Sequence, residues 1–381
     1  MKKKILFLVN DLSFFISHRL NIALSAKANG YKVKIIYGEV AKQKEKILIQ
    51  KKNIEFLEIP LLRSSLNPFK ELWVFFVILY NFYLFKPDIV HLITIKAYLY
   101  GGIAARLARV PCVVISIAGL GSFFHRKNLK NLIFKFLVYP IFYLAFRHSN
   151  QYIIVQNLED KKILGNWGVL NLKKVYLIKG SGVQLKKFVH LNEKKTIVKI
   201  CFASRLLKDK GVYDFVNAAN LIKKRGFNAR FLLAGSIDLD NPTSLTQKEL
   251  NNIRNQGVVE VLGFKKNIAR LYSESHIICL PSFFGEGMPK ALIEAGAASR
   301  AIITTNHPGC RDAIIPNKTG ILVPIKNPKK LADAIQWLIE NPKKRKKMGK
   351  EGRKLAEKKF PIEKVSQQHL KIYQKLIGNL I

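Results

Sequence analysis

Two glutamates, Glu286 and Glu294, stand eight residues apart in the segment from Phe284 to Gly296. The apolar run before this segment ends at Pro281 and predicts a buried strand, and the glycines after it predict a tight turn into a helix. One carboxylate then lies at the turn and the other two helical turns further on, where both can face one crevice. The amides at the start of a helix bind anions and hydroxyl groups. We therefore expect a site for a ligand with several hydroxyls and a diphosphate, as in a nucleotide sugar.

Two cations, Arg205 and Lys210, lie in a segment that follows a predicted strand and precedes a predicted helix. This position places them at the carboxyl end of a strand, on the same edge as Glu286. A leaving nucleoside diphosphate gains negative charge as its bond to the sugar breaks, and fixed cations stabilise that charge in the transition state. A basic pair in a loop is, taken alone, more often a solvated turn. Combined with the two glutamates, the pair favours a diphosphate site.

The elements that position these residues are strand-length apolar runs alternating with helical patterns along the whole chain. Such runs, separated by helices, predict an α/β fold with parallel sheets covered on both faces. The predicted strands are 4–9, 32–37, 54–59, 89–93, 112–117, 152–155, 175–178, 197–202, 230–233, 258–262, 277–280 and 301–304. The predicted helices include 18–28, 97–108, 213–224 and 290–298.

The strand pattern restarts after the glycine-rich break at Gly180–Val183, which predicts two domains. Residues 1–183 would form an N-terminal acceptor-binding domain and residues 184–360 a C-terminal nucleotide-sugar-binding domain, each a doubly wound Rossmann-like unit. The last helix, 361–381, is expected to pack back on the first domain. Ligands of such folds bind at the carboxyl ends of the strands, here in a cleft that the two domains face.

The composition narrows the class of protein and its partners. The chain has 381 residues, 49% of them hydrophobic, which is enough for two cores and argues against disorder. Its net charge of +40 is spread over both halves, but no nucleic-acid-binding motif accompanies the charge, so an anionic membrane surface is favoured over nucleic acid. The densest basic run, 343–359, is expected to be a solvated helix face.

Two segments of the first half, 72–85 and 132–146, are apolar around most of a helical circumference and are flanked by basic residues. Two interpretations stay open. Each segment could be a helix enclosed in the core, or a helix lying in the membrane interface with its aromatic rings among the headgroups. No uninterrupted apolar run reaches the roughly 18–20 residues of a membrane span, so we expect a peripheral protein.

A series of short motifs runs through the chain in a fixed order. In the second half they are Arg205…Lys210-Gly211, Gly235, Leu262-Gly-Phe264, Pro281-Ser282, Glu286-Gly-Met-Pro289, Glu294-Ala295 and Gly309. In this order they resemble the second domain of the family 4 retaining glycosyltransferases, which have the GT-B fold. Four further segments resemble the branch that acts on polyprenyl-diphosphate-linked sugars, as in bacterial undecaprenyl-diphosphate-linked N-acetylgalactosaminyltransferases of glycan and O-antigen assembly. These segments are 11–19, 64–68, 119–122 and 308–311.

The resemblance implies a retaining hexosyltransferase with a UDP-sugar donor. It implies that Arg205 and Lys210 contact the donor diphosphate and that Glu286 holds sugar hydroxyls, and these three are the candidate catalytic residues. The other implied donor-binding residues are Gly287, Met288 and Pro289 at the sugar, Glu294 at the ribose, and Gly263, Phe264 and Lys265 at the uracil.

The acceptor and any metal are less closely defined by the sequence. His18 and Arg19 follow the first strand and Lys96 follows the fourth, where each could bind an acceptor diphosphate or simply be an exposed helix turn. The resemblance implies no essential metal and no cofactor, and the Asp238/Asp240 pair is expected to form a turn. Many relatives have a histidine where this chain has Ala118, so no side-chain base is carried over.

The expected reaction moves an (N-acetyl)hexosamine or related hexose from a UDP-sugar to a polyprenyl-diphosphate-linked saccharide, in surface-polysaccharide or glycan biosynthesis. The protein would work as a peripheral protein on the cytoplasmic face of the inner membrane. Two alternatives remain: the same fold acting on a lipopolysaccharide core or a soluble acceptor, and a non-enzymatic binder of anions or nucleic acid.

Overall fold

The first strand, β1 (Lys4–Val9), illustrates how the sequence builds a sheet that is covered on both faces. Its apolar side chains alternate between two core layers. Leu6 and Leu8 pack into one hydrophobic cluster, whereas Ile5 and Phe7 pack into the other. Because both faces are apolar, β1 lies in the middle of a parallel sheet, with strands paired on either side.

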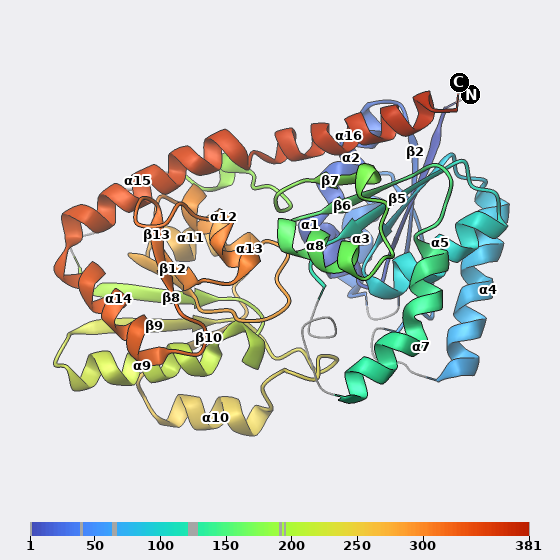
Figure 1. Cartoon of the computed structure of the whole chain (residues 1–381). Helices are drawn as coiled ribbons and strands as arrows, with labels where there is room; N and C mark the ends of the chain where they lie inside the picture. The colour runs from blue at the N-terminus through green and yellow to red at the C-terminus, as the bar shows by residue number, and fades with distance from the viewer. Residues whose placement is uncertain are drawn as a thin grey trace. The chain divides into compact units, whose positions relative to one another are not determined.

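The computed structural model describes residues 2–38, 41–62, 67–120, 129–189, 193 and 196–380, except for the side chains of residues 129–134 and 137. The chain divides into two compact units (Figure 1). Unit 1 contains Met1–Ser181 and Glu363–Ile381, and unit 2 contains Gly182–Ile362.

Unit 1 is a seven-stranded parallel sheet in the order β3-β2-β1-β4-β5-β6-β7, with helices on both faces. Its other strands are β2 (Lys32–Gly38), β3 (Glu55–Ile59), β4 (Ile89–Ile93), β5 (Cys112–Ile117), β6 (Gln151–Val155) and β7 (Val175–Leu177). Its helices are α1 (Leu12–His18), α2 (Leu20–Ala28), α3 (Gln43–Gln50), α4 (Pro68–Phe85), α5 (Ile95–Leu107), α7 (Leu129–Ala145), α8 (Leu158–Asn166) and the C-terminal α16 (Ile362–Gly378).

Unit 2 is a six-stranded parallel sheet in the order β10-β9-β8-β11-β12-β13. The strands are β8 (Val198–Ala203), β9 (Ala229–Ala234), β10 (Glu260–Gly263), β11 (Ile277–Leu280), β12 (Ala301–Thr305) and β13 (Gly320–Val323). The helices are α9 (Val212–Lys224), α10 (Gln247–Asn255), α11 (Ile268–Ser273), α12 (Lys290–Ala297), α13 (Pro308–Arg311), α14 (Pro328–Glu340) and α15 (Pro342–Lys359).

The predicted fold class, two doubly wound parallel sheets, is confirmed, but two local predictions were wrong. The first helix begins at Leu12 rather than His18, because the Asp11 side chain caps it by accepting from the amides of Ser13 and Phe14 at 2.7 and 3.2 Å. This helix then breaks at Arg19. Strand β13, which pairs with β12, was missed by the sequence analysis.

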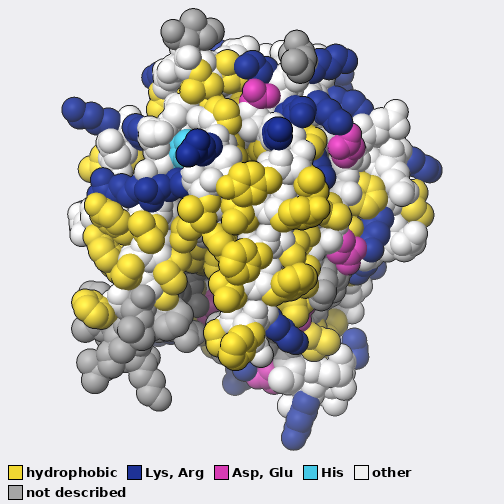
Figure 2. Space-filling view, turned by 90° about the vertical axis from the view of Figure 1, so that its right-hand side faces the viewer, with side chains coloured by type: hydrophobic (Ala, Val, Ile, Leu, Met, Phe, Trp, Pro, Cys, Tyr) yellow, Lys and Arg dark blue, Asp and Glu magenta, His cyan; other side chains and the backbone are white. Residues whose placement is uncertain are grey.

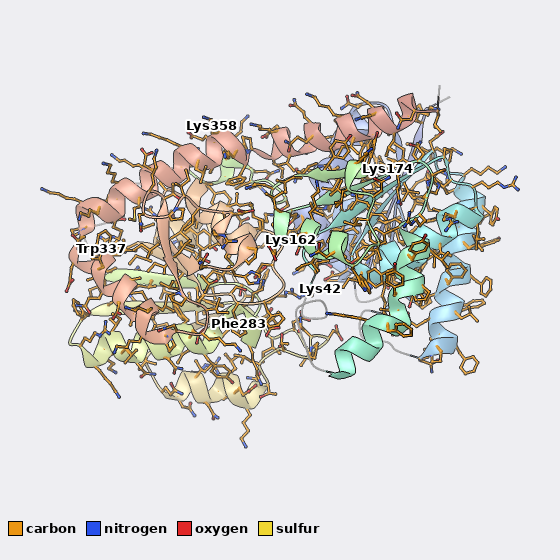
Figure 3. All side chains as sticks on the ribbon, viewed as in Figure 1. Lys42, Lys162, Lys174, Phe283, Trp337 and Lys358 are labelled. Atoms are coloured by element: carbon orange, nitrogen blue, oxygen red, sulfur yellow. The ribbon has the colours of Figure 1, made fainter. Side chains whose placement is uncertain are left out.

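Basic helix α15 agrees with the expected solvated face. Its apolar and small residues, such as Met348 and Ala356, are buried, while most of its lysines are exposed. Figure 3 shows Lys358 pointing away from the unit, and Trp337 on the preceding helix is covered by the Lys344 ammonium at 5.1 Å from the ring centre. Much of the positive charge of unit 2 therefore lies on a surface helix.

A buried polar cluster joins α16 to the sheet of unit 1. His91 of β4 lies 2.6 Å from both the Tyr373 hydroxyl and the Ser116 hydroxyl. Its ring stacks on that of His369, 5.8 Å away between centres. Burial is the largest cause that lowers the pKa of both histidines, and the nearby charge of Arg19 lowers it further. Both histidines are therefore held neutral.

This cluster predicts acid sensitivity of folding. Burial and Arg19 lower the pKa of His369 to about 3, against 6.5 for a solvated histidine. The stability that this group contributes is thus present above pH 6.5 and is lost as the pH falls below it, by about 1.4 kcal/mol per pH unit. Urea unfolding between pH 7 and 4.5 should show this loss, and His369→Gln should reduce its slope. Equal slopes for the two proteins would contradict the prediction.

Candidate active site

The candidate site lies where neighbouring strands of unit 2 end. Arg205 follows β8, Asp238 follows β9, Phe264 follows β10 and Glu286 follows β11. Since all strands of the sheet are parallel, these four loops lie at the same edge. The amide of Gly235, directly after β9, donates to the carbonyl oxygen of Gly263, the last residue of β10, at 2.9 Å, and so holds the starts of two of these loops together.

Lys210 and Glu286 form an ion pair between Nζ and Oε1 at the centre of this edge. Both are largely enclosed, with 17% of the Lys210 side chain and 9% of the Glu286 side chain exposed. The hydroxyl of Ser282 lies 2.7 Å from the same carboxylate oxygen and 3.1 Å from the carbonyl oxygen of Asp209, in the turn that carries Lys210. The sequence brought the two charged residues to one edge, and the structure brings them into contact.

The ionisation of Glu286 is set by two opposing influences. Burial raises the pKa of a carboxyl group, but the Lys210 ammonium and the Ser282 hydroxyl outweigh it, and the pKa of Glu286 is lowered overall. The charge of His307, in the loop after β12, adds to this lowering. Glu286 is therefore a fixed carboxylate at neutral pH, able to accept hydrogen bonds from sugar hydroxyls.

Two glycines allow the loops to approach one another. A Cβ atom on Gly309 would lie 2.2 Å from the carbonyl oxygen of Gly287 and 2.6 Å from that of Glu286. A Cβ atom on Gly211, whose φ is +77°, would lie 2.2 Å from the carbonyl oxygen of Pro281. No other residue type fits at either position without moving the backbone that holds Glu286.

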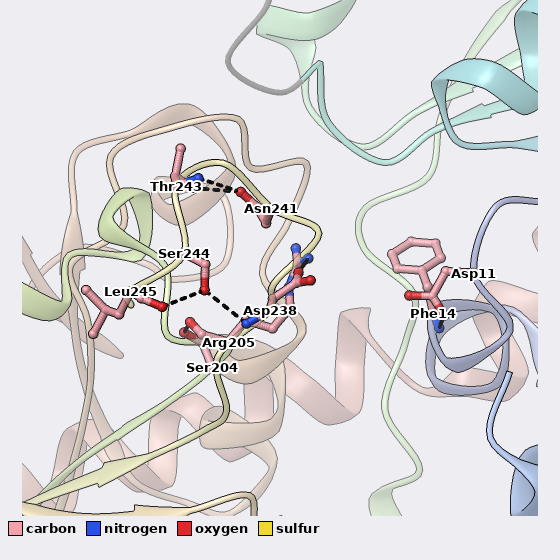
Figure 4. A network of polar contacts seen from close by, with 9 residues as sticks. All are labelled: Asp11, Phe14, Ser204, Arg205, Asp238, Asn241, Thr243, Ser244 and Leu245. Atoms are coloured by element: carbon pink, nitrogen blue, oxygen red, sulfur yellow. Dashed lines mark hydrogen bonds and ion pairs between the residues drawn. The ribbon is translucent and has the colours of Figure 1, made fainter. Parts of the chain in front are cut away.

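Arg205 is paired with Asp238 rather than with a glutamate. Its guanidinium contacts the Asp238 carboxylate at 2.6 Å, and nearly half of the Arg205 side chain is exposed. Figure 4 shows this pair beside the turn in which the Ser244 hydroxyl accepts from the Asp238 amide at 3.0 Å, and the Asn241 side chain accepts from Thr243 at 3.0 Å. The Asp238 loop is a turn, as expected, and it orients an accessible cation.

Glu294 lies on the second turn of α12, where Lys290 is 3.6 Å away. Burial raises the pKa of Glu294, and Lys290 opposes that rise. Gly287, Met288 and Pro289 are buried where the helix begins, and no side chain caps that end of the helix. The backbone amides at the start of α12 thus lie next to the Lys210–Glu286 pair.

The loop after β10 presents an aromatic surface at the same edge. The Phe264 side chain is 71% exposed, and Lys265 beside it is also exposed. Gly263 has a φ of +67°, which turns the chain sharply out of the strand. A flat exposed ring of this kind suits stacking against a nucleobase.

The three predicted acceptor residues lie in unit 1, and the structure places one of them, Arg19, in the core. Arg19 is only 1% exposed, and burial lowers its pKa to about 10, so it is a core residue rather than a surface cation. Lys96 is held by Glu71 at 2.7 Å and by the carbonyl oxygen of Leu62 at 2.9 Å. His18 is half-buried and stacks on the ring of Phe14.

Some predicted motifs fall partly outside the described residues: 64–66 of the 64–68 motif and 121–122 of the 119–122 motif. Ala118, where many relatives have a histidine, is described and half-buried. Among the described residues, no group of three or more histidine, cysteine, aspartate or glutamate side chains is arranged to hold a metal ion.

Comparison with known proteins identifies the family. Residues 183–355 match the family "Glycosyl transferases group 1", and residues 4–157 match "Glycosyl transferase 4-like". The chain is 31% identical over 333 residues to the N,N'-diacetylbacillosaminyl-diphospho-undecaprenol alpha-1,3-N-acetylgalactosaminyltransferase of Campylobacter jejuni, covering 84% of this chain and 85% of that one. It is 29% identical to the UDP-Gal:alpha-D-GlcNAc-diphosphoundecaprenol alpha-1,3-galactosyltransferase of Escherichia coli, with 59% of each chain covered.

The fold is also that of solved glycosyltransferases. The crystal structure of Anabaena Alr3699/HepE in complex with UDP-glucose superposes with a TM-score of 0.77, at 17% identity, covering 98% of this chain and 99% of that one. A glycosyltransferase from Rickettsia africae has the same TM-score, at 21% identity and with 99% of both chains covered. The chain therefore belongs to the group 1 family of glycosyltransferases and has the GT-B fold.

Proposed function

We propose that this glycosyltransferase moves an (N-acetyl)hexosamine or related hexose from a UDP-sugar to a polyprenyl-diphosphate-linked saccharide, with retention of configuration. The observation that carries the proposal is the enclosed Lys210–Glu286 pair next to the start of α12. Two relatives, from Campylobacter jejuni and Escherichia coli, support the acceptor class, because each is named for transfer to a diphospho-undecaprenol-linked sugar. The UDP-glucose complex of Anabaena HepE supports the donor class.

In this proposal each residue at the carboxyl edge of the unit 2 sheet has one role. Lys210 and Arg205 stabilise the charge on the leaving diphosphate, with the amides of Gly287 and Met288 as neutral donors. Glu286 accepts hydrogen bonds from donor-sugar hydroxyls. The remaining contacts are Glu294 with the ribose, and Phe264, between Gly263 and Lys265, with the uracil.

The bond changes balance without a protein base. The bond from the anomeric carbon to the diphosphate oxygen breaks, and the acceptor hydroxyl oxygen bonds to that carbon on the same face. The hydroxyl proton passes to the departing phosphate oxygen. The leaving diphosphate itself is the base in this proposal.

We further propose that the reaction needs no metal and takes place on the cytoplasmic face of the inner membrane, where the protein is peripheral. The Asp238 carboxylate, which has the spacing of a metal ligand with Asp240, is engaged by Arg205. Two cations at the diphosphate would supply the charge that Mg²⁺ provides elsewhere. Excess EDTA should therefore leave the transfer rate unchanged.

The test is a transfer assay with a panel of labelled UDP-sugars and a short polyprenyl-diphosphate-linked saccharide. Labelled product should pass into organic solvent, and NMR should show the donor's anomeric configuration in the new linkage. Glu286→Gln should abolish transfer while the protein stays folded. Product that remains in the aqueous phase would favour a lipopolysaccharide core or soluble acceptor, and binding of nucleic acid without transfer would overturn the proposal.

A further inference from the structure

Helix α4 has an apolar side in the core and a second apolar side on the surface. Val74, Ile78 and Phe82 are buried against the core of unit 1. The opposite side carries seven large hydrophobic side chains, each between 52% and 82% exposed. They are Phe69, Leu72, Trp73, Phe76, Tyr80, Tyr83 and Leu84, and we call them the α4 stripe.

The α4 stripe is unusual for a surface helix, which normally turns charged residues to solvent. Single exposed hydrophobics are common, but a set that recurs from Phe69 to Leu84, about 24 Å of helix, marks an interaction surface. Figure 2 shows hydrophobic side chains gathered in one band on this side of the chain. Neighbouring helices extend the apolar surface through Leu107 of α5 and Phe136, Ile141, Tyr143 and Leu144 of α7.

Positive charge lies at the ends of this surface. The ammonium groups of Lys4, Lys32 and Lys34 lie 5.4–5.8 Å from the ring centre of Phe85, the last residue of α4. At the end of α7, the Arg147 guanidinium lies 4.2 Å from the ring centre of Tyr143. Phe85 itself is buried, whereas Tyr143 is exposed. Basic side chains at the edge of an apolar, aromatic surface match the headgroup layer of an anionic bilayer.

The one carboxylate of α4 is neutralised within the protein. Glu71 accepts from the Lys96 ammonium at 2.7 Å and from the Tyr100 hydroxyl at 2.5 Å. These contacts hold the negative charge in an ion pair, where it would otherwise repel anionic headgroups. Lys96, predicted as an acceptor ligand, thus has a role in shaping the charge of this surface.

Other occupants fit the surface less well. Two copies of this chain would each bring a net charge of +40 to a shared interface. By length and composition α4 is also the one helix, among the described residues, that could cross a membrane. However, its Val74–Ile78–Phe82 side is packed in the core of unit 1, so the helix is held along the protein surface.

We infer that the α4 stripe and the adjoining side of α7 form the surface by which this protein lies in the interface of an anionic bilayer, with α4 parallel to the membrane plane. The aromatic side chains would sit at the level of the acyl–headgroup boundary, and the lysines around Phe85 would contact lipid phosphates. The inference rests on the proposed function only in that a polyprenyl acceptor resides in the same bilayer.

Sedimentation with vesicles tests the inference independently of catalysis. The full-length protein should bind phosphatidylglycerol vesicles at least tenfold more tightly than phosphatidylcholine vesicles. The variant Trp73→Glu/Phe76→Glu/Tyr80→Glu should bind at least tenfold more weakly than the wild type. The control Leu158→Glu/Val189→Glu/Leu380→Glu makes the same change of charge at exposed apolar residues outside the stripe, and it should bind much as the wild type does.

Tryptophan emission supplies a second measurement. Trp73 is 64% exposed, so its emission should shift to the blue on binding and should be quenched by brominated lipid. The variant Trp73→Phe should bind vesicles without the shift. The inference would be overturned if both triple variants lost vesicle binding equally, or if the emission of Trp73 did not shift on binding. A dimer of the wild type that the stripe variant dissociates would also overturn it.

The two proposals can fail separately. If the stripe variant loses vesicle binding yet transfers sugar to a short water-soluble acceptor at the wild-type rate, both stand. If the protein binds vesicles through Trp73 but transfers no sugar, the membrane surface stands and the proposed reaction fails.

Discussion

Replacing Lys210 with alanine will lower kcat for sugar transfer by about 10³-fold, because the charge on the leaving diphosphate loses its most enclosed cation. The same change leaves Glu286 buried without its ion-pair partner, which costs about 3 kcal/mol of stability. Steady-state kinetics with a saturating UDP-sugar and urea unfolding at pH 7 measure the two effects.

The pH dependence separates the two roles of Lys210. Without the ammonium, burial raises the pKa of Glu286, so protonation removes the unpaired charge and the stability deficit should shrink as the pH falls from 7 to 5. The double variant Lys210→Ala/Glu286→Gln should recover most of the stability and none of the activity. A double variant as unstable as Lys210→Ala would show that the ion pair is not what Lys210 contributes to folding.

Adding a single methyl group, in Gly309→Ala, should lower kcat/KM by at least about 10²-fold. The new Cβ would need space now occupied by the carbonyl oxygens of Gly287 and Glu286, at 2.2 and 2.6 Å. The loop would have to shift by about an ångström. A displacement of that size lowers the rate by about 10²-fold when it moves a catalytic group. The transfer assay and a thermal melt are the measurements.

The control for this prediction is Gly378→Ala near the end of α16, where a Cβ would meet nothing within 4 Å. This variant should keep full activity and should be as stable as the wild type or slightly more so, since alanine is the better helix former. Because Gly309 lies in the short helix α13 and not in a strand of the sheet, its variant should still melt cooperatively. Wild-type kinetics for Gly309→Ala would refute the proposed position of Glu286 in the reaction.

The sequence was most informative where residue type and strand position act together. Parallel sheets place every loop that follows a strand at one edge, so the order of Arg205, Lys210 and Glu286 along the chain was enough to bring them to one side of unit 2. The alternation of apolar runs with helices likewise predicted both sheets. What failed was local: the early start of α1 depends on a single cap at Asp11.

The spacing of residues along the sequence could not predict most of the side-chain contacts at the site. The contact of Asp238 with Arg205 and the nearness of His307 to Glu286 join loops that are far apart in the chain. The contact of Ser282 with Glu286 lies within one loop, and a serine two residues after β11 and four before Glu286 was a usable signal for it. Nothing in the local sequence of Arg19 marked it as buried, because α16, which covers it, lies some 350 residues later.

The amino-acid sequence by itself determined the fold class, the family resemblance and the sheet edge at which Arg205, Lys210 and Glu286 lie, since these follow from periodic burial and from loops of fixed direction. Only the tertiary structure decided that Lys210 and Glu286 touch, that Arg19 is a core residue, and that one side of α4 is exposed. The reason is that ion pairing and solvent exposure depend on which distant segments pack together. An apolar helix has the same residues whether its outer side meets protein, lipid or water.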